Sequence, residues 1–302
     1  MRPLLCLCAL LGASCLDRII LDGTVKSTRD AASAFDTLSD LEVARTAAAS
    51  SLVQLEGMQK LAPDNEDALY LLTQSWAGFA GAFIEDEWEA AVDRGDDEAE
   101  AFQARRARDA YERSLRFGTL LLEQKRPGFV AAQRNADTMK TYLAGYTAKA
   151  DAESLLWVGA AWLSRGSVAS DDPAVVADLF VGVALLERAV ELDEGIAYGT
   201  ALAALGAYHA RSPDAELPEA KRLFERALTL TNRGALTVQL LYAQNWACNA
   251  HDQATYETLL KEVLAAGDVL PAQRLENTVA KKKAARYLGA ARLQRCGFSR
   301  TP

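Results

Sequence analysis

The sequence has few of the residues from which metal centres and catalytic sites are built. It contains two histidines, His209 and His251, among 302 residues, and neither belongs to a His/Cys/carboxylate cluster with metal-ligand spacing. A nucleophile needs a base held close to it, and no such pairing is recognisable. There is also no G-x-S-x-G turn and no glycine-rich phosphate loop. We therefore expect no metal, no cofactor and no enzymatic activity.

Positive charge is also in short supply. Lys and Arg together number 33 against 41 Asp and Glu, which gives a formal net charge of −8. Proteins that bind nucleic acids present a basic stripe to the phosphates. The charge balance therefore excludes nucleic acid as the expected partner.

Long hydrophobic runs are missing as well. The N-terminal run over residues 3–11 is about ten residues long, whereas a membrane-spanning helix needs about 20. The charged Met1-Arg2 precedes this run, and the small residues Gly12, Ala13 and Ser14 follow it. This order predicts a signal peptide over residues 1–14.

Cys15 directly follows the small residues and resembles the acylated cysteine of a bacterial lipobox, although Gly12 stands where Leu is usual. We expect Cys15 to carry the lipid and residues 15–29 to form a lipidated tether. Leu16 rather than Asp follows it, which favours the inner leaflet of the outer membrane over retention at the inner membrane. The protein would then be periplasmic. Ordinary secretion with cleavage near Ser14 is the alternative.

Two cysteines remain beyond the anchor, Cys248 and Cys296. An oxidising periplasm would permit a disulfide between them. Because Cys248 is expected inside a helix and Cys296 near the end of the chain, two separate buried thiols are the preferred expectation.

One helical phrase occurs twice in the second half of the chain. The stretch 185–192, LLERAVEL, returns as 223–230, LFERALTL, 38 residues later. In each copy the apolar residues form a stripe at helical spacing, so the helix must bury that stripe against another helix. A turn containing Gly195 or Gly234 and a second helix follow each copy. A helix pair repeated at this period is typical of tetratricopeptide-like solenoids.

Similar periodicity fills most of the remaining chain. We therefore expect an all-α fold, a tetratricopeptide-like α-solenoid of antiparallel helix pairs over residues 30–295, with a C-terminal tail over 296–302. Pro63 and Gly128 mark two of the breaks between helices. The expected helices cover 31–61, 66–83, 98–123, the stretch that contains 152–162, the two copies of the phrase at 185–192 and 223–230, 196–209, 235–250, 255–265 and 274–293.

Two charged runs invite functional interpretation. Residues 85–100 hold nine carboxylates, yet they lack the pattern of a calcium-binding loop. We expect a solvated acidic loop leading into the next helix. Lys281, Lys282 and Lys283 could hold a phosphate or lipid headgroup, but three adjacent lysines usually solvate the outer face of a helix, and that is the expectation here.

The ordered set of phrases resembles the T component of tripartite ATP-independent periplasmic (TRAP) transporters, the TatT-type lipoproteins. The phrases are LLWVGAAW at 155–162, LERAVELD at 186–193, AKRLFERAL at 220–228 and RLENT at 274–278. The resemblance implies a periplasmic lipoprotein that docks the transporter's solute-binding protein. It also implies a homotrimer whose protomers each contain a channel for an apolar or organic-acid ligand.

Aromatic side chains are the candidates for the ligand- or partner-binding surface. Trp157 and Trp162 are five residues apart on one helix, so they point in different directions. One is expected in the core, and the other could reach a cavity. The full candidate set is Trp157, Trp162, Tyr208, Tyr242 and Trp246. Core packing is the alternative for each.

Two functions from different classes follow. The first is a transport-associated scaffold or ligand conduit, anchored in the membrane by its N-terminal lipid. The second is a general tetratricopeptide-like adaptor in bacterial envelope assembly. Aromatics around an internal tunnel would favour the first, and aromatics along one open groove would favour the second. We expect Arg188, Arg226, Glu187 and Glu225 to form pairs between repeats, which contribute little when they are exposed.

Overall fold

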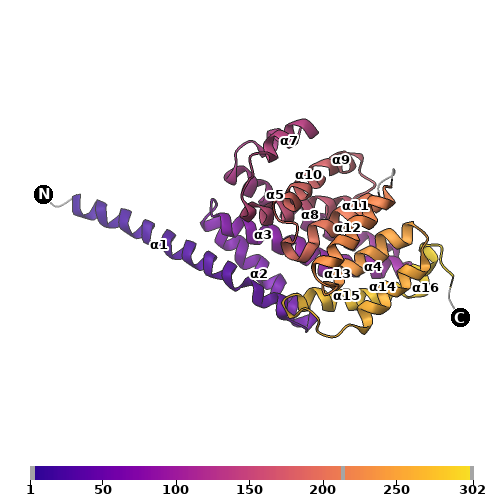
Figure 1. The fold of residues 1–302 in the computed structure, drawn as a ribbon. Helices are drawn as coiled ribbons and strands as arrows, with labels where there is room; N and C mark the ends of the chain where they lie inside the picture. Colours follow the sequence, from indigo (N-terminus) through magenta and orange to yellow (C-terminus); the bar gives the residue numbers. More distant parts are fainter. Residues whose placement is uncertain (1–3, 212–214, 300–302) are drawn as a thin grey trace.

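A computed structural model describes the backbone of residues 4–211 and 215–299 and the side chains from residue 18 onward (Figure 1). Every regular element in these ranges is a helix, and no strand occurs among them. This confirms the all-α class. None of the described helices combines the length and apolar character needed to cross a bilayer.

The chain begins with α1 (Leu4–Ala31), whose first half projects away from the rest of the molecule (Figure 1). The second half packs on the body, where Val25 is buried and Arg29 lies 2.5 Å from Asp67 and 2.7 Å from Glu153. The expected tether over residues 15–29 is therefore helical, and its anchoring role stays a prediction. The backbone of Cys15 lies within α1, and its side chain is outside the described residues.

The first helix pair consists of α2 (Leu41–Leu61) and α3 (Glu66–Phe79), preceded by the 3₁₀ turn η1 (Ala32–Thr37). Asp40 caps α2 by accepting hydrogen bonds from two backbone amides, and Asn65 caps α3 in the same way. Leu55 of α2 packs with Leu69 and Leu72 of α3 in one apolar cluster. The expected helix over 31–61 is interrupted at residues 38–40.

The acidic stretch is helical, which corrects the expectation of a solvated loop. α3 continues through the π-helical segment η2 (Ala80–Ile84) into α4 (Glu85–Arg94), which ends at Gly95 in the left-handed conformation with φ 68°. Asp86 and Glu89 are buried. The sequence pattern could not reveal this because the cations that neutralise them lie about 200 residues later in the chain.

The middle of the molecule is built on α5 (Asp97–Lys125), close to the expected 98–123, and on α8 (Ala152–Val168) and α10 (Leu179–Leu192). α8 and α10 approach closely where Gly159 meets Gly182. A Cβ atom on Gly182 would lie 2.8 Å from the Trp162 Cβ and 3.1 Å from the Gly159 carbonyl oxygen. Short elements connect these helices: α6 (Phe129–Ala132), α7 (Ala136–Leu143), η3 (Lys149–Asp151) and α9 (Pro173–Ala177).

The duplicated phrase forms α10 and α12 (Leu217–Leu230), as predicted. Leu185, Leu186 and Ala189 are buried, and so are their counterparts Leu223, Phe224 and Ala227. The partner helices are less regular than expected. α11 (Thr200–Arg211) follows the 3₁₀ turn η4 (Ile196–Gly199), and α13 (Leu236–Leu241) continues as the π-helical η5 (Tyr242–Ala247). The turn before α11 and the turn before α13 each contain two consecutive non-glycine residues with positive φ, at 197–198 and 232–233 respectively.

The chain ends by returning to its beginning. After α14 (Gln253–Ala265) and η6 (Pro271–Gln273), α15 (Arg274–Tyr287) packs against η1 and α2, and α16 (Ala290–Arg295) packs against α4 (Figure 1). The single helix expected over 274–293 is broken at Gly289, whose ψ of 156° is extended. Of the expected tail, residues 300–302 lie outside the described part.

Candidate functional sites

The strongest concentration of charge lies where α4 meets α15 and α16. Asp86, Glu89 and Asp93 follow one another at steps of three and four residues, so they share one face of α4. Five cations approach this face, and we call the eight residues the ionic cluster. Its cationic members are Lys282, Lys283, Arg286, Arg292 and Arg295.

Each carboxylate of the cluster has several partners. Asp86 pairs with Arg286 and lies 2.9 Å from the Lys282 ammonium. Glu89 pairs with Arg286 and lies 3.5 Å from Lys283, and it also accepts a hydrogen bond of 2.7 Å from the Tyr287 hydroxyl. Such charge-assisted bonds compensate for the loss of hydration.

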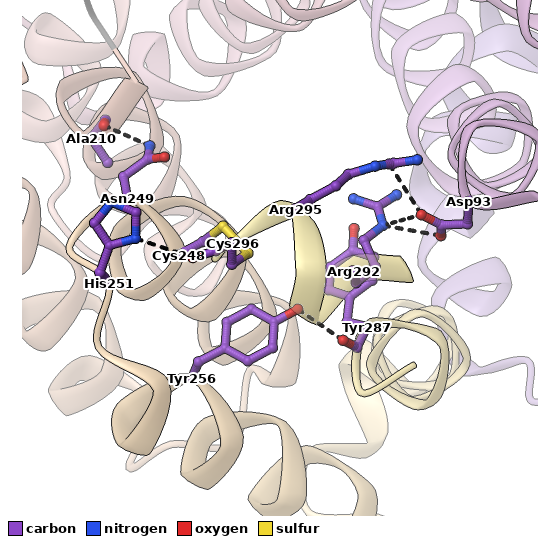
Figure 2. Close-up of a disulfide and its surroundings, with 10 residues drawn as sticks. All are labelled: Asp93, Ala210, Cys248, Asn249, His251, Tyr256, Tyr287, Arg292, Arg295 and Cys296. Carbon is purple, nitrogen blue, oxygen red and sulfur yellow. Dashed lines mark hydrogen bonds and ion pairs between the residues drawn. A yellow bond between two sulfur atoms is a disulfide. The ribbon is translucent and has the colours of Figure 1, made fainter. Parts of the chain in front are cut away.

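Asp93 completes the cluster from the end of α4. Its carboxylate lies 2.7 Å from Arg292, 3.1 Å from Arg286 and 3.1 Å from Arg295. Figure 2 shows the Arg292 and Arg295 side chains reaching this carboxylate from α16. One face of α4 is therefore fastened to both C-terminal helices.

The pKa values of the cluster follow from this pairing. Burial alone would raise the pKa of Asp86 and of Glu89, but the surrounding Lys and Arg side chains outweigh burial and lower both pKa values. Lys283 is buried with them, which corrects the expectation that all three lysines face solvent. Cations occupy this acidic face, and among the described residues no group of His, Cys, Asp and Glu is arranged to hold a metal.

Cys248 and Cys296 form a disulfide, which corrects the expectation of two separate thiols (Figure 2). Their Cα atoms are 4.9 Å apart. Their separation of 48 positions in the sequence hid this proximity, because it depends on α16 folding back onto the end of the η5 helix. The His251 Nδ1 lies 3.1 Å from the Cys296 carbonyl oxygen on the same side. The bridge thus holds the helix that supplies Arg292 and Arg295.

A second polar group adjoins the ionic cluster and centres on Arg211. The Arg211 guanidinium donates a 2.9 Å hydrogen bond to Ser167 and is exposed. Even so, desolvation by the surrounding protein lowers its pKa, although Glu85 and Glu89 oppose this. Arg211 is thus in contact with solvent, while the protein around its guanidinium disfavours the charged form.

Glu85 is the anionic neighbour of Arg211. The Tyr111 hydroxyl donates to its carboxylate at 2.6 Å, and burial raises the pKa of Glu85 even though Lys283 lowers it. With Glu85 and Arg211 included, six cations face four carboxylates in this region. A chain with a net charge of −8 therefore concentrates an excess of two positive charges here.

The aromatic candidates do not form one site. Tyr242 is buried and stacks on Phe224, with 5.0 Å between ring centroids, and it meets Trp246 at 5.3 Å. The Trp246 indole donates to the Leu217 carbonyl at 2.8 Å, with Lys221 over its ring. These two aromatics therefore join α12 to η5.

The other three aromatics lie on α8 and α11. Trp162 is buried and meets Phe129 edge-on at 6.2 Å, and its indole nitrogen has no hydrogen-bond partner within the described chain. Trp157 is half-buried between two apolar clusters, so the two tryptophans differ in burial. Tyr208 lies beside His209.

Two hollows open on the surface, and neither is lined by the five aromatics. One of about 490 Å³ lies at the α12–α13 turn and includes Arg233, Gln239 and Glu262. Another of about 240 Å³ includes Lys125, Arg126 and Asp151. Their linings thus support neither the internal aromatic tunnel expected of a ligand conduit nor the open aromatic groove expected of an envelope adaptor.

The two repeat arginines differ in their partners. Arg226 pairs with Glu194 of the preceding repeat at 2.5 Å, as expected. Arg188 instead donates to the Tyr146 carbonyl at 3.1 Å and pairs with Glu191 on its own helix. Glu225 also pairs within its helix, with Lys221. No ion pair of Glu187 is found within the described chain, and burial raises its pKa.

Two further carboxylates meet where η1 docks on α15. Burial raises the pKa of Asp36 to about 6, and burial together with Asp36 raises the pKa of Glu276 to about 7. One Glu276 carboxylate oxygen has no hydrogen-bond partner in the part of the chain that the structure describes. Arg274 holds the same junction by donating to the Thr37 carbonyl at 2.9 Å.

Comparison with known proteins places these features in context. The family model of the TRAP transporter T-component matches residues 37–292. No curated protein matches the chain. The matched region includes α4, α15 and the first half of α16, and so contains all of the ionic cluster except Arg295, together with Glu85 and Arg211.

Proposed function

The chain belongs to the TRAP transporter T-component family, and from this premise we propose that it docks the transporter's solute-binding protein and passes that protein's ligand. The family is a transporter-associated component rather than an enzyme class, and its membership is consistent with a periplasmic location. The proposal adds a homotrimer, anchored by acylated Cys15 at the inner leaflet of the outer membrane.

Electrostatics supports an acidic rather than an apolar ligand. The single observation that carries this choice is Arg211, a guanidinium with solvent contact, no ion pair among the described residues and a desolvated setting beside an excess of positive charge. A guanidinium offers paired donors that match a carboxylate. An organic acid bound at Arg211 would also offset the excess of cations among these side chains.

The aromatics take a smaller part in this proposal. Trp162 and Tyr242 are buried in the core, so they shape the interior rather than stack on a ligand. Trp157, Tyr208 and Trp246 are half-buried and stay candidates for a ligand or partner contact.

The docking proposal is tested by capture of the full-length protein from crosslinked cells. We expect recovery of a solute-binding protein together with the transporter's membrane subunits. Recovery of cell-wall or outer-membrane assembly proteins without a solute-binding protein would favour the envelope adaptor instead. Mass spectrometry of the N-terminal peptide tests acylation of Cys15, and light scattering tests the trimer.

The ligand proposal is tested by calorimetry with a panel of carboxylates from acetate to succinate and benzoate. We expect the Arg211→Gln variant to lose at least about tenfold in affinity, because an ionic hydrogen bond contributes about 1.5–3 kcal/mol. Arg222→Gln is the matched control, since Arg222 is exposed on the outer face and paired with Glu219. Equal affinities for both variants would contradict a role for Arg211.

A further inference from the structure

The turn between α2 and α3 is fastened to α1 one helical turn beyond Cys15. The Arg18 guanidinium lies 2.5 Å from the Asp64 carboxylate, and the Asn65 amide donates to Asp22 at 2.7 Å. Arg18 and Asp22 also pair with each other at 3.1 Å. The end of α2 therefore moves with this part of α1.

Three large apolar side chains stand out at this junction. Ile19 is 67% exposed and Ile20 is 59% exposed on α1, and Leu61 is 73% exposed at the end of α2. We call these three residues the anchor tip. The charges of Arg18, Asp22 and Asp64 beside it are paired with one another. Lys60, next to Leu61, is an exposed cation, which suits an anionic lipid surface.

Beyond the tip, the exposed side of α1 carries hydroxyls and one pair of opposite charges. The hydroxyls of Thr24, Ser27 and Thr28 each donate at 2.9 Å to the carbonyl four residues earlier, so these donors are satisfied within the helix. Lys26 and Asp30 lie 3.9 Å apart and are exposed. The part of α1 that follows the tip is therefore solvated, and the apolar exposure is confined to the tip.

The position of Cys15 fixes what covers the tip. Cys15 belongs to the same helix, so Ile19 and Ile20 lie about 6–7.5 Å from it along the axis, at about 1.5 Å per residue. Acyl chains on Cys15 would hold that residue at the bilayer surface. Interfacial helices bury their apolar faces to a depth of about 5–10 Å at the headgroup boundary, which includes the level of both isoleucines.

We propose that the anchor tip is a membrane-docking surface that seats Ile19, Ile20 and Leu61 in the headgroup region of the bilayer. The proposal rests on acylation of Cys15, which belongs to the proposed function. Because Leu61 is on a different helix from the isoleucines, the contact fixes the orientation of the body relative to the membrane and does not only limit its distance. Arg211 would then be held at a defined position relative to the membrane.

Spin labels on the acylated full-length protein test the proposal. Ile20→Cys and Leu61→Cys place labels in the tip, and Val43→Cys is the matched control. Val43 is also exposed, at 53%, but it lies about 27 Å from Leu61 along α2 at about 1.5 Å per residue. The disulfide keeps Cys248 and Cys296 from reacting with the label.

The readout is accessibility to oxygen and to a water-soluble nickel chelate, with and without phosphatidylethanolamine–phosphatidylglycerol vesicles. We expect vesicles to raise oxygen accessibility and to reduce nickel accessibility at positions 20 and 61, without change at 43. Tip labels that stay as nickel-accessible as the control on vesicle-bound, acylated protein would overturn the proposal and leave the anchor intact.

Two further outcomes are decisive. An unacylated N-terminal peptide would overturn the lipid anchor, and the membrane-docking surface with it. Loss of nickel accessibility at positions 20 and 61 in a Cys15→Ser variant without vesicles would show that a second copy of the chain covers the tip, and this also overturns the proposal. Capture of the solute-binding protein is independent of all three readouts.

Discussion

At the scale of single residues, the sequence did not predict the structural roles of several charged side chains and of two cysteines. Asp86 and Glu89 belong to an acidic run that would normally be solvated, yet both are buried among cations. Arg211 carries no motif, and only its place in the fold makes it a candidate for binding an anion. The same holds for the cysteine pair, whose proximity depends on how the last helix folds back.

The disulfide should contribute measurably to stability. Replacing both Cys248 and Cys296 by Ser is expected to lower the free energy of unfolding by about 2–4 kcal/mol, because the bridge closes a loop of 48 residues and restricts the unfolded chain. Denaturant unfolding with and without dithiothreitol measures this. Reductant should destabilise the wild type to the level of the double variant and leave that variant unchanged. Equal stabilities without reductant would contradict the prediction.

At the scale of helices, the duplicated phrase and its buried stripe could be predicted because periodicity records which face is covered. The residues at which helices change geometry could not. We attribute three such changes to packing between elements that are distant in sequence. They are the π-helical segments at 80–84 and 242–247 and the break at Gly289. The helix propensities of the residues do not depend on these distant contacts, so they could not predict where the helices change.

The contact between α8 and α10 depends on the absence of side chains at Gly159 and Gly182. Gly182→Ala is expected to cost about 1–3 kcal/mol, because the new methyl group would overlap Trp162 and the Gly159 carbonyl. Gly57→Ala on α2 is the matched control, since an added Cβ there meets no atom within 4 Å. Thermal unfolding of both variants measures the difference. A neutral Gly182→Ala would show that α8 and α10 can separate without loss.

The junction of η1 with α15 should depend on pH. The pKa of Glu276, about 7, lies above its ordinary value of 4.5, so the folded state holds the proton more tightly than the unfolded state does. Stability is therefore lost as pH rises from 4.5 through 7. Glu276→Gln should stabilise the protein by about 1–3 kcal/mol at pH 8 and by much less at pH 5.

Melting temperatures of the wild type and Glu276→Gln at pH 5, 6.5 and 8 test this dependence. Glu98→Gln controls for charge removal at an exposed helix start. A Glu276→Gln effect of equal size at all three pH values would instead indicate improved packing, independent of the carboxylate proton.

At the scale of the whole molecule, the fold class was accessible from sequence, but the return of the C-terminal helices to α4 was not. Helix periodicity predicts that the apolar face of each helix is covered by another helix, but it does not show which one. The contact joins residues about 200 positions apart through the ionic cluster. The sequence shows which residues are charged, but which of them pair depends on how the complete chain folds.

The ionic cluster should be a major contributor to global stability. Glu89→Gln would leave Lys283, Arg286 and Arg292 with less buried negative charge, and breaking a buried pair typically costs about 3–5 kcal/mol. Urea unfolding measures the loss. Arg226→Ala is the control, because its pair with Glu194 is exposed and worth at most about 1 kcal/mol. Similar effects of the two variants would contradict the prediction.

Acid should weaken the same cluster. Because pairing lowers the pKa of Glu89 and Asp86 below their ordinary 4.5 and 3.8, the unfolded state takes up protons first. The contribution of these two carboxylates to stability is full at neutral pH and falls as pH drops below about 4.5. Glu89→Gln should reduce this loss, which acid titration of the unfolding midpoint measures.

The contact of α4 with the C-terminal helices α15 and α16 also restricts how such a protein can change in evolution. An open helical-repeat array can gain or lose units, since each unit contacts only its neighbours. Here, insertion or deletion of one 38-residue unit between α4 and α15 would displace five cations from three carboxylates. We therefore expect proteins that share this ionic cluster to keep the number of helices between α4 and α15 and to differ by substitution.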